Sequence, residues 1–139
     1  MVFVIDSRIE STSVWLADWP LSSLYLKKEA NFPWVILVPR VDNIQELYQL
    51  SQVNRQLVIE EIAALSKMME EYFKPDKLNV GALGNIVSQL HIHVVARFKE
   101  DKAWPHSIWQ PELSTSVYAD EILQDLVEVL QERLLKIMR

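Results

Sequence analysis

The sequence predicts one α+β domain built on a five-stranded antiparallel sheet. Short segments rich in β-branched and aromatic residues form a group of three and a later group of two. Between and after these groups, two long stretches carry apolar residues at every third or fourth position, which indicates amphipathic helices. The resulting order is three strands, a short and a long helix, two strands, an irregular arm over residues 102–113 and a final helix. We expect the helices to pack on one side of the sheet.

The first three strands are expected at residues 13–17, 22–28 and 34–39, because Pro20 and Pro33 punctuate the chain between them. The third carries four consecutive apolar residues, so both of its faces should be covered and it should lie centrally. The last two strands are expected at residues 78–83 and 89–98.

Helix starts and helix faces are also visible in the sequence. Asn43 followed by Glu46 resembles a capping box for a short helix ending at residue 50, and Ser51 can cap a long helix over residues 53–73. Four glutamates of the long helix are expected on its solvated face: Glu60, Glu61, Glu70 and Glu71. A last helix is expected at residues 119–138.

Composition excludes several classes of function. The 139 residues form a single domain, 1–139, with no linker, and the lack of cysteine excludes disulfides and thiolate metal sites. A net charge of −5 with scattered basic residues argues against nucleic acid as a partner. No apolar stretch approaches the ~18–20 residues of a membrane span, and the first residues lack the basic start of a signal peptide. We therefore expect a cytoplasmic protein without a membrane partner.

Two of the three histidines, His91 and His93, are two residues apart in an expected strand. Because side chains alternate along a strand, Gln89, His91, His93 and Val95 should share one face, and the residues between them should face the core. Successive side chains on one face are ~6.5–7 Å apart, which lets two imidazoles contact neighbouring oxygens of one phosphate. The only glycines, Gly81 and Gly84, lie upstream, in a turn whose backbone N–H groups could face an anion.

Two other interpretations of the histidine pair stay open at this point. The pair can be a chance feature of a half-exposed strand face, or it can be a zinc site, since His-x-His is a common zinc pair. A zinc site lacks an evident third ligand, because His106 lies on the arm and Glu100 and Asp101 follow the end of the strand. We expect no metal.

The segment from Gln89 to Val95 resembles the signature of the histidine triad (HIT) superfamily, in which three histidines alternate with apolar residues. Residues 34–40 are similar to the family's central strand, which ends in proline and a basic residue, and Trp104-Pro105 is similar to a Trp-Pro pair after the triad. The resemblance covers residues 13–109. It implies a HIT-like fold that dimerises, with helix 53–73 and strand 78–83 as the material of a homodimer interface.

The resemblance also implies nucleotide chemistry without a cofactor. His91 would attack the α-phosphorus of a nucleotide and form a nucleotidyl-histidine, which water then cleaves, while His93 would donate to the phosphate oxygens. The substrate classes would be nucleoside phosphoramidates, adenylated small molecules or dinucleoside polyphosphates. By the same resemblance, nucleotide and phosphate contacts would come from Asn79, Gly84, Asn85, Trp34 and Trp104. Trp104 and Trp109 can instead be packing anchors of the arm, which we favour.

Three positions depart from the family pattern. Gln89 replaces the first histidine, although its backbone carbonyl can still hold the ring of His91 and its side-chain amide can still bind phosphate or the leaving group. Ile86 stands where relatives carry a hydroxyl, and Trp34 stands where they often carry a histidine, so both changes are expected to remove polar function. These departures favour an alternative, a nucleotide-binding protein with little or no turnover.

Overall fold

Five antiparallel strands form the sheet in the spatial order β1-β2-β3-β5-β4, which confirms the predicted sheet and the central place of β3. The computed structural model describes residues 2–138, and its strands are β1 (Ser13–Asp18), β2 (Ser22–Lys27), β3 (Trp34–Pro39), β4 (Lys77–Gly81) and β5 (Ile92–Arg97). The last two strands are shorter than predicted. Gln89 and His91 therefore precede β5 instead of belonging to it.

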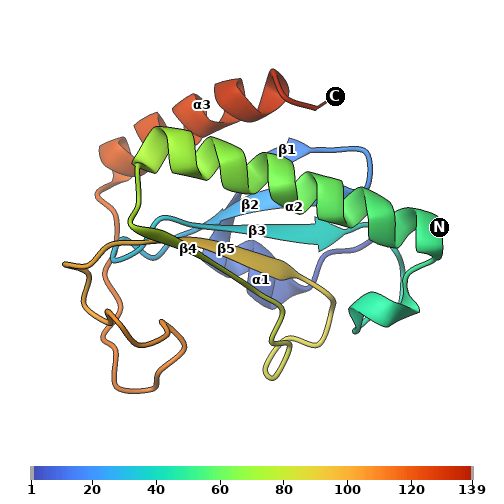
Figure 1. Ribbon diagram of the computed structural model, residues 1–139, viewed down its shortest axis with the longest axis horizontal. Helices are drawn as coiled ribbons and strands as arrows, with labels where there is room; N and C mark the ends of the chain where they lie inside the picture. The colour runs from blue at the N-terminus through green and yellow to red at the C-terminus, as the bar shows by residue number, and fades with distance from the viewer. Residues whose placement is uncertain (1, 139) are drawn as a thin grey trace.

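Helices α2 (Gln52–Phe73) and α3 (Asp120–Leu135) cover one face of the sheet, as Figure 1 shows. The hydroxyl of Ser51 accepts a hydrogen bond from the N–H of Asn54 at 3.1 Å, so the predicted cap of α2 is confirmed. Helix α2 ends at Phe73, and the residue that follows it, Lys74, has a left-handed φ of 53°. Within residues 2–138 no helix has the length and apolarity needed to cross a bilayer. The main core lies between these helices and the sheet and includes Leu24, Leu26, Val35, Leu37, Val58, Leu65, Met69, Ile92, Val94, Leu130 and Leu134.

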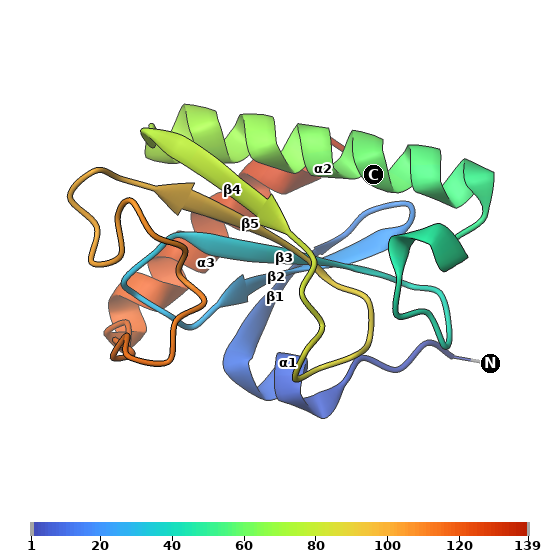
Figure 2. The ribbon, with the colours of Figure 1, turned by 60° about the horizontal axis from the view of Figure 1, so that its bottom comes forward.

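The opposite face is covered by a third helix, α1 (Ser7–Thr12), and by the arm, residues 98–119 (Figure 2). Ile9 of α1 packs against Ile36 and Val38 of β3. Ala103 and Ile108 of the arm pack against Val95 of β5. The expectation that the helices lie on one side is therefore wrong for α1, a helix too short to show apolar periodicity.

Two local predictions are also wrong. Asn43 has a φ of 57°, outside the extended range of an N-cap, and the short helix is a 3₁₀ turn, η1 (Leu47–Gln49), capped by Glu46. Glu61 is not solvated: it is fully buried, and its Oε2 accepts a hydrogen bond from the N–H of Leu21 at 2.9 Å. The turn between β1 and β2 lies under α2, so its backbone N–H needs a partner from that helix.

Candidate functional site

His91 and His93 lie side by side on the face covered by α1 and the arm. Their ring centroids are 4.7 Å apart and their planes meet at 68°. The predicted alternation is present, because Leu90, Ile92 and Val94 belong to the main core on the other face. Both imidazoles are buried, with 9% and 7% of the residue surface exposed for His91 and His93. The histidine face is therefore enclosed by protein.

The backbone fixes the tautomer of His91. Its Nδ1 lies 2.7 Å from the carbonyl oxygen of Gln89. A carbonyl oxygen only accepts, so Nδ1 carries the proton and donates. In the neutral ring the lone pair is then on Nε2, which is the arrangement that a nucleophile or a general base requires.

The opposite tautomer is fixed at His93. The indole Nε1–H of Trp34 donates to Nδ1 of His93 at 2.9 Å. An indole nitrogen is only a donor, so Nδ1 is unprotonated and the neutral ring carries its proton on Nε2. Trp34 thus supplies a polar contact to the site, and the expectation that it removes polar function is wrong.

Both imidazoles are held in the neutral form. Burial, with smaller contributions from the neighbouring His91 and Lys27, lowers the pKa of His93 to about 3. Burial is also the main cause of the lowered pKa of His91, opposed by the hydrogen bond to the Gln89 carbonyl. One neutral ring therefore offers a lone pair and its neighbour offers an N–H.

The side chain of Gln89 is used elsewhere. Its Oε1 accepts a hydrogen bond from the N–H of Asp6 at 2.8 Å, and its Nε2 donates to the carbonyl of Val4 at 2.9 Å. The guanidinium of Arg8 donates to the carbonyl of Ile86 at 3.1 Å. Gln89 therefore fastens the N-terminal segment, residues 2–6, beside the site, and its amide is not free to bind phosphate as the sequence suggested.

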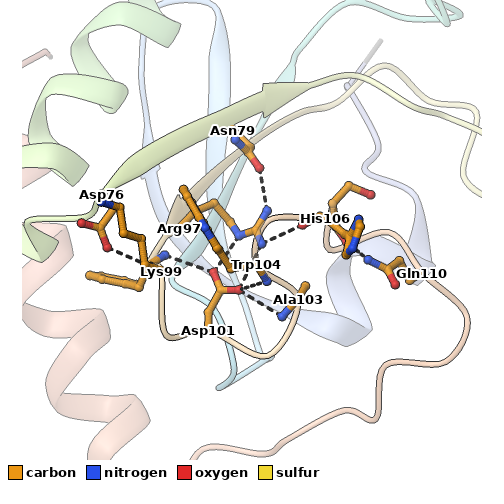
Figure 3. A network of polar contacts seen from close by, with 11 residues as sticks. Asp76, Asn79, Arg97, Lys99, Asp101, Ala103, Trp104, His106 and Gln110 are labelled. Carbon is orange, nitrogen blue, oxygen red and sulfur yellow. Dashed lines mark hydrogen bonds and ion pairs between the residues drawn. The ribbon is translucent and has the colours of Figure 1, made fainter.

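A buried network around Arg97 holds the arm (Figure 3). The guanidinium binds both carboxylate oxygens of Asp101, at 2.8 and 3.0 Å, and donates to Oδ1 of Asn79 at 2.7 Å and to the carbonyl of His106 at 2.8 Å. The guanidinium also lies 5.8 Å from the ring centroid of Trp104. Asn79 and Trp104, expected to contact the nucleotide, have structural partners in this network.

The anchored arm brings Trp109 onto the histidine pair. Its ring centroid lies 5.3 Å from that of His93 and 6.3 Å from that of Trp34. The indole N–H of Trp109 is buried without a hydrogen-bond partner in residues 2–138. Trp109 is a packing anchor, as favoured from the sequence, and the surface on which it packs is the histidine site itself.

A pocket of about 180 Å³ opens beside His91, between the residues around η1 and the loop after β4. Gly84 lines this pocket, and its φ of 70° is a conformation that glycine adopts without strain. Asn85 is exposed on the same loop and is not part of the pocket wall. A larger pocket, of about 450 Å³, lies between α2 and α3, away from the histidines.

Lys27 is a charged neighbour of the histidines that the sequence analysis missed. Its ammonium lies 5.5 Å from the ring centroid of Trp34 and donates to the hydroxyl of Thr12 at 2.8 Å. Lys27 is the last residue of β2 in the structure. Only the pairing of β2 with β3, which local sequence does not reveal, places it next to Trp34.

A metal site receives no third ligand here. Among residues 2–138, no three histidine, cysteine, aspartate or glutamate side chains gather closely enough to hold a metal ion together. Nδ1 of each site histidine is engaged, by a carbonyl at His91 and by an indole N–H at His93. The nitrogens left for other contacts are the two Nε2 atoms.

Comparison with known proteins places this geometry in a family. A family model described as the HIT domain matches residues 8–100. A histidine triad protein from Marinobacter aquaeolei VT8 is 36% identical, with a TM-score of 0.92 over 99% of both chains. One from Bradyrhizobium japonicum is 34% identical, with a TM-score of 0.91 over 96% of this chain and 98% of that chain. One from Sinorhizobium meliloti 1021 is 29% identical, with a TM-score of 0.89 over 94% and 96%.

No curated protein matches the chain. The family model nevertheless spans more than half of it, and the two structures above 30% identity cover nearly its whole length. The fold, the paired histidines and these similarities agree, and the chain belongs to the HIT family, whose members generally act on nucleotides.

Proposed function

We propose that the protein is a nucleotidyl hydrolase or transferase that acts at the α-phosphorus of a nucleotide. The supporting observation is the pair of opposite tautomers, with the lone pair of His91 on Nε2 and the proton of His93 on Nε2. Because the two rings lie 4.7 Å apart, one phosphate group can meet both. Such a pair combines a nucleophile with a donor for the charge that develops on phosphorus oxygens.

In the proposed first step, Nε2 of His91 forms a bond to phosphorus and the bond to the leaving group breaks, with its electron pair going to the leaving group. The Nε2–H of His93 donates to a non-bridging oxygen as the phosphorus becomes five-coordinate. In the second step, water attacks phosphorus and loses a proton to the solvent. The N–P bond breaks, and its electron pair returns to Nε2 of His91. The Gln89 carbonyl keeps the proton of His91 on Nδ1 throughout.

The site is poor in acids that could protonate a leaving group. Both imidazoles are neutral, the Gln89 amide is bound to the N-terminal segment, and Ile86 is an exposed hydrocarbon side chain. Among nucleoside phosphoramidates, adenylated small molecules and dinucleoside polyphosphates, we expect faster reaction where the leaving group departs as a carboxylate or phosphate anion. An amine must gain a proton as it leaves.

A second candidate function is nucleotide binding with little turnover. The observation that favours it is the same loss of an acid, together with the burial of both rings and the packing of Trp109 on His93. In this case the histidine pair would hold a phosphate without transferring it.

Turnover separates the two candidates. Release of AMP should be measured with acetyl-adenylate and with an adenosine 5′-phosphoramidate, for the wild type and for His91→Ala. We expect the wild type to release AMP and the variant to lose ~10³-fold or more, as enzymes do on losing a nucleophile. His106→Ala is the matched control, because His106 is exposed on the arm. AMP binding by calorimetry without AMP release would establish the second candidate instead.

We also propose a cytoplasmic homodimer formed along β4 and α2. β4 is an edge strand of the sheet, and Val80 on β4, Leu83 after it and Ile59 on α2 are exposed apolar side chains. Sedimentation at micromolar concentration should show a dimer that Val80→Lys weakens and the distant control Ile122→Lys does not. A wild-type monomer of 16.2 kDa would contradict the proposal.

A further inference from the structure

Lys27 is a half-buried cation for which the protein provides no counter-ion. Among residues 2–138 it forms no ion pair, and its one side-chain hydrogen bond goes to the neutral hydroxyl of Thr12. Burial lowers the pKa of Lys27, and no carboxylate opposes that effect. A lysine ammonium has three donors, so two remain for a ligand.

The position of Lys27 relative to the histidines follows from strand pairing. Leu26 pairs with Val35 on β3, so Lys27 comes next to Trp34, and Trp34 pairs with Val95 on β5. Val95 is four residues beyond His91, which is ~13 Å along an extended chain. β2 is also two strand spacings, ~10 Å, from β5. The ammonium lies on the site face over Trp34, whose indole donates to His93, so Lys27 is on the His93 side of the histidine pair.

Of the charged groups near the histidine pair, Lys27 is not engaged by another charge. Lys27 and Asp6 both influence the pKa of His91. Asp6 is already paired with Arg8, at 2.9 Å, whereas Lys27 is unpaired within the described chain. With both imidazoles neutral, Lys27 is the positive charge that this face can offer to an anion. An unpaired, partly desolvated cation attracts an anion more strongly than a solvated surface lysine does.

We propose that Lys27 forms a second anion subsite, which binds a phosphate group of the ligand other than the one that meets His91. The inference deepens the proposed function, because it names the substrate class as a nucleotide that carries an additional phosphate. Because Lys27 lies over Trp34, on the His93 side of the pair, we assign to it a phosphate other than the one that Nε2 of His91 attacks. The additional phosphate can come from the ribose or from the phosphate chain, and the chemistry of recognition is the same for both.

Equilibrium binding tests the subsite without requiring turnover. Dissociation constants should be measured by calorimetry for AMP, for ADP and for adenosine 3′,5′-bisphosphate. We expect at least one of the two probes with an extra phosphate to bind about 10- to 100-fold more tightly than AMP, the range of a charge-assisted hydrogen bond. A preference for the bisphosphate assigns the subsite to a ribose phosphate, and a preference for ADP assigns it to the phosphate chain.

Variants then assign the preference to Lys27. Lys27→Gln should reduce the ratio to about one, Lys27→Arg should keep part of it, and the exposed neighbour control Lys28→Gln should keep all of it. Thermal unfolding should be used to check that each variant is folded. If Lys27→Gln does not fold, the partial loss of the ratio in Lys27→Arg still tests the subsite. Equal binding of the three probes by the wild type, binding of none of them, or a ratio that survives in Lys27→Gln would overturn the subsite.

The subsite and the proposed function can fail separately. His91→Ala should keep the binding ratio, because Lys27 is assigned a different phosphate from the one that meets His91. A ratio that depends on Lys27 in a protein that never releases AMP would refute the nucleotidyl transfer and leave the subsite intact. AMP release by a protein whose binding ratio does not depend on Lys27 would support the nucleotidyl transfer and refute the subsite.

Discussion

Acidification should destabilise the protein through His93. Its ordinary pKa is 6.5, and burial lowers it to about 3 in the folded chain. Between pH 6.5 and 3, the ring is therefore protonated in the unfolded chain and neutral in the folded chain. The free energy of unfolding falls as the pH falls through this range. The indole N–H of Trp34 faces Nδ1 of His93 and also favours the neutral ring, because protonation of Nδ1 would bring two N–H groups face to face.

The size of the effect follows from the two pKa values. At pH 5 the unfolded ring is almost fully protonated and the folded ring almost fully neutral, which gives a loss of about 2 kcal/mol in the free energy of unfolding relative to pH 7.5. The ordinary pKa of aspartate is 3.8, so pH 5 keeps most carboxylate titration out of the comparison. His91 shifts in the same direction and adds to the loss in every variant that keeps it.

Urea unfolding at pH 7.5 and pH 5, followed by tryptophan fluorescence, measures this loss. His93→Gln removes the titrating ring, so its loss between the two pH values should be about 2 kcal/mol smaller than that of the wild type. His106→Gln, a change on the exposed part of the arm, should show the wild-type loss. An equal loss in the wild type and His93→Gln would refute the conclusion that the fold holds His93 neutral.

Three substitutions test the contacts around the site. Trp34→Phe keeps the packing but removes the donor to His93, so kcat for AMP release should fall by up to ~10-fold with KM little changed, and an unchanged kcat would show that the tautomer does not matter. Gln89→Leu should lower the free energy of unfolding by about 1–3 kcal/mol and speed hydrogen exchange in the N-terminal segment. Exchange at the wild-type rate would show that Gln89 does not hold this segment in place. Asp101→Asn removes one partner of a buried ion pair and should lower the free energy of unfolding by about 3 kcal/mol or more; a loss below ~1 kcal/mol would contradict the role of the network in holding the arm.

Short-range patterns in the sequence predicted the sheet and the histidine pair well. Strand alternation placed His91 and His93 on one face and their neighbours in the core, because a two-residue period leaves no other arrangement. The hydrogen bond from His91 to the Gln89 carbonyl was expected from the resemblance to the HIT superfamily, because a backbone carbonyl is present whichever residue stands at position 89.

Contacts between distant residues were not predictable in this way. The Gln89 amide binds Asp6, 83 positions away, and nothing near Gln89 in the sequence signals such a partner. Trp34 and His93 are 59 positions apart, so the polar role of the indole became visible only once β3 and β5 were paired. The position of Lys27 beside Trp34 depended on the register between β2 and β3. The fold class could therefore be predicted from local periodicity. The hydrogen bonds and charges around the site depend on strand register and on the path of the N-terminal segment, which local periodicity does not show.

The central claim is that His91 becomes covalently nucleotidylated. The wild type should be mixed with acetyl-adenylate, quenched rapidly without acid, and analysed by intact-mass and peptide mass spectrometry. We predict an adenylyl adduct that maps to His91, decays in water with release of AMP, and is absent from His91→Ala. Bound AMP with no adduct at any quench time, or an adduct that persists in His91→Ala, would contradict the account.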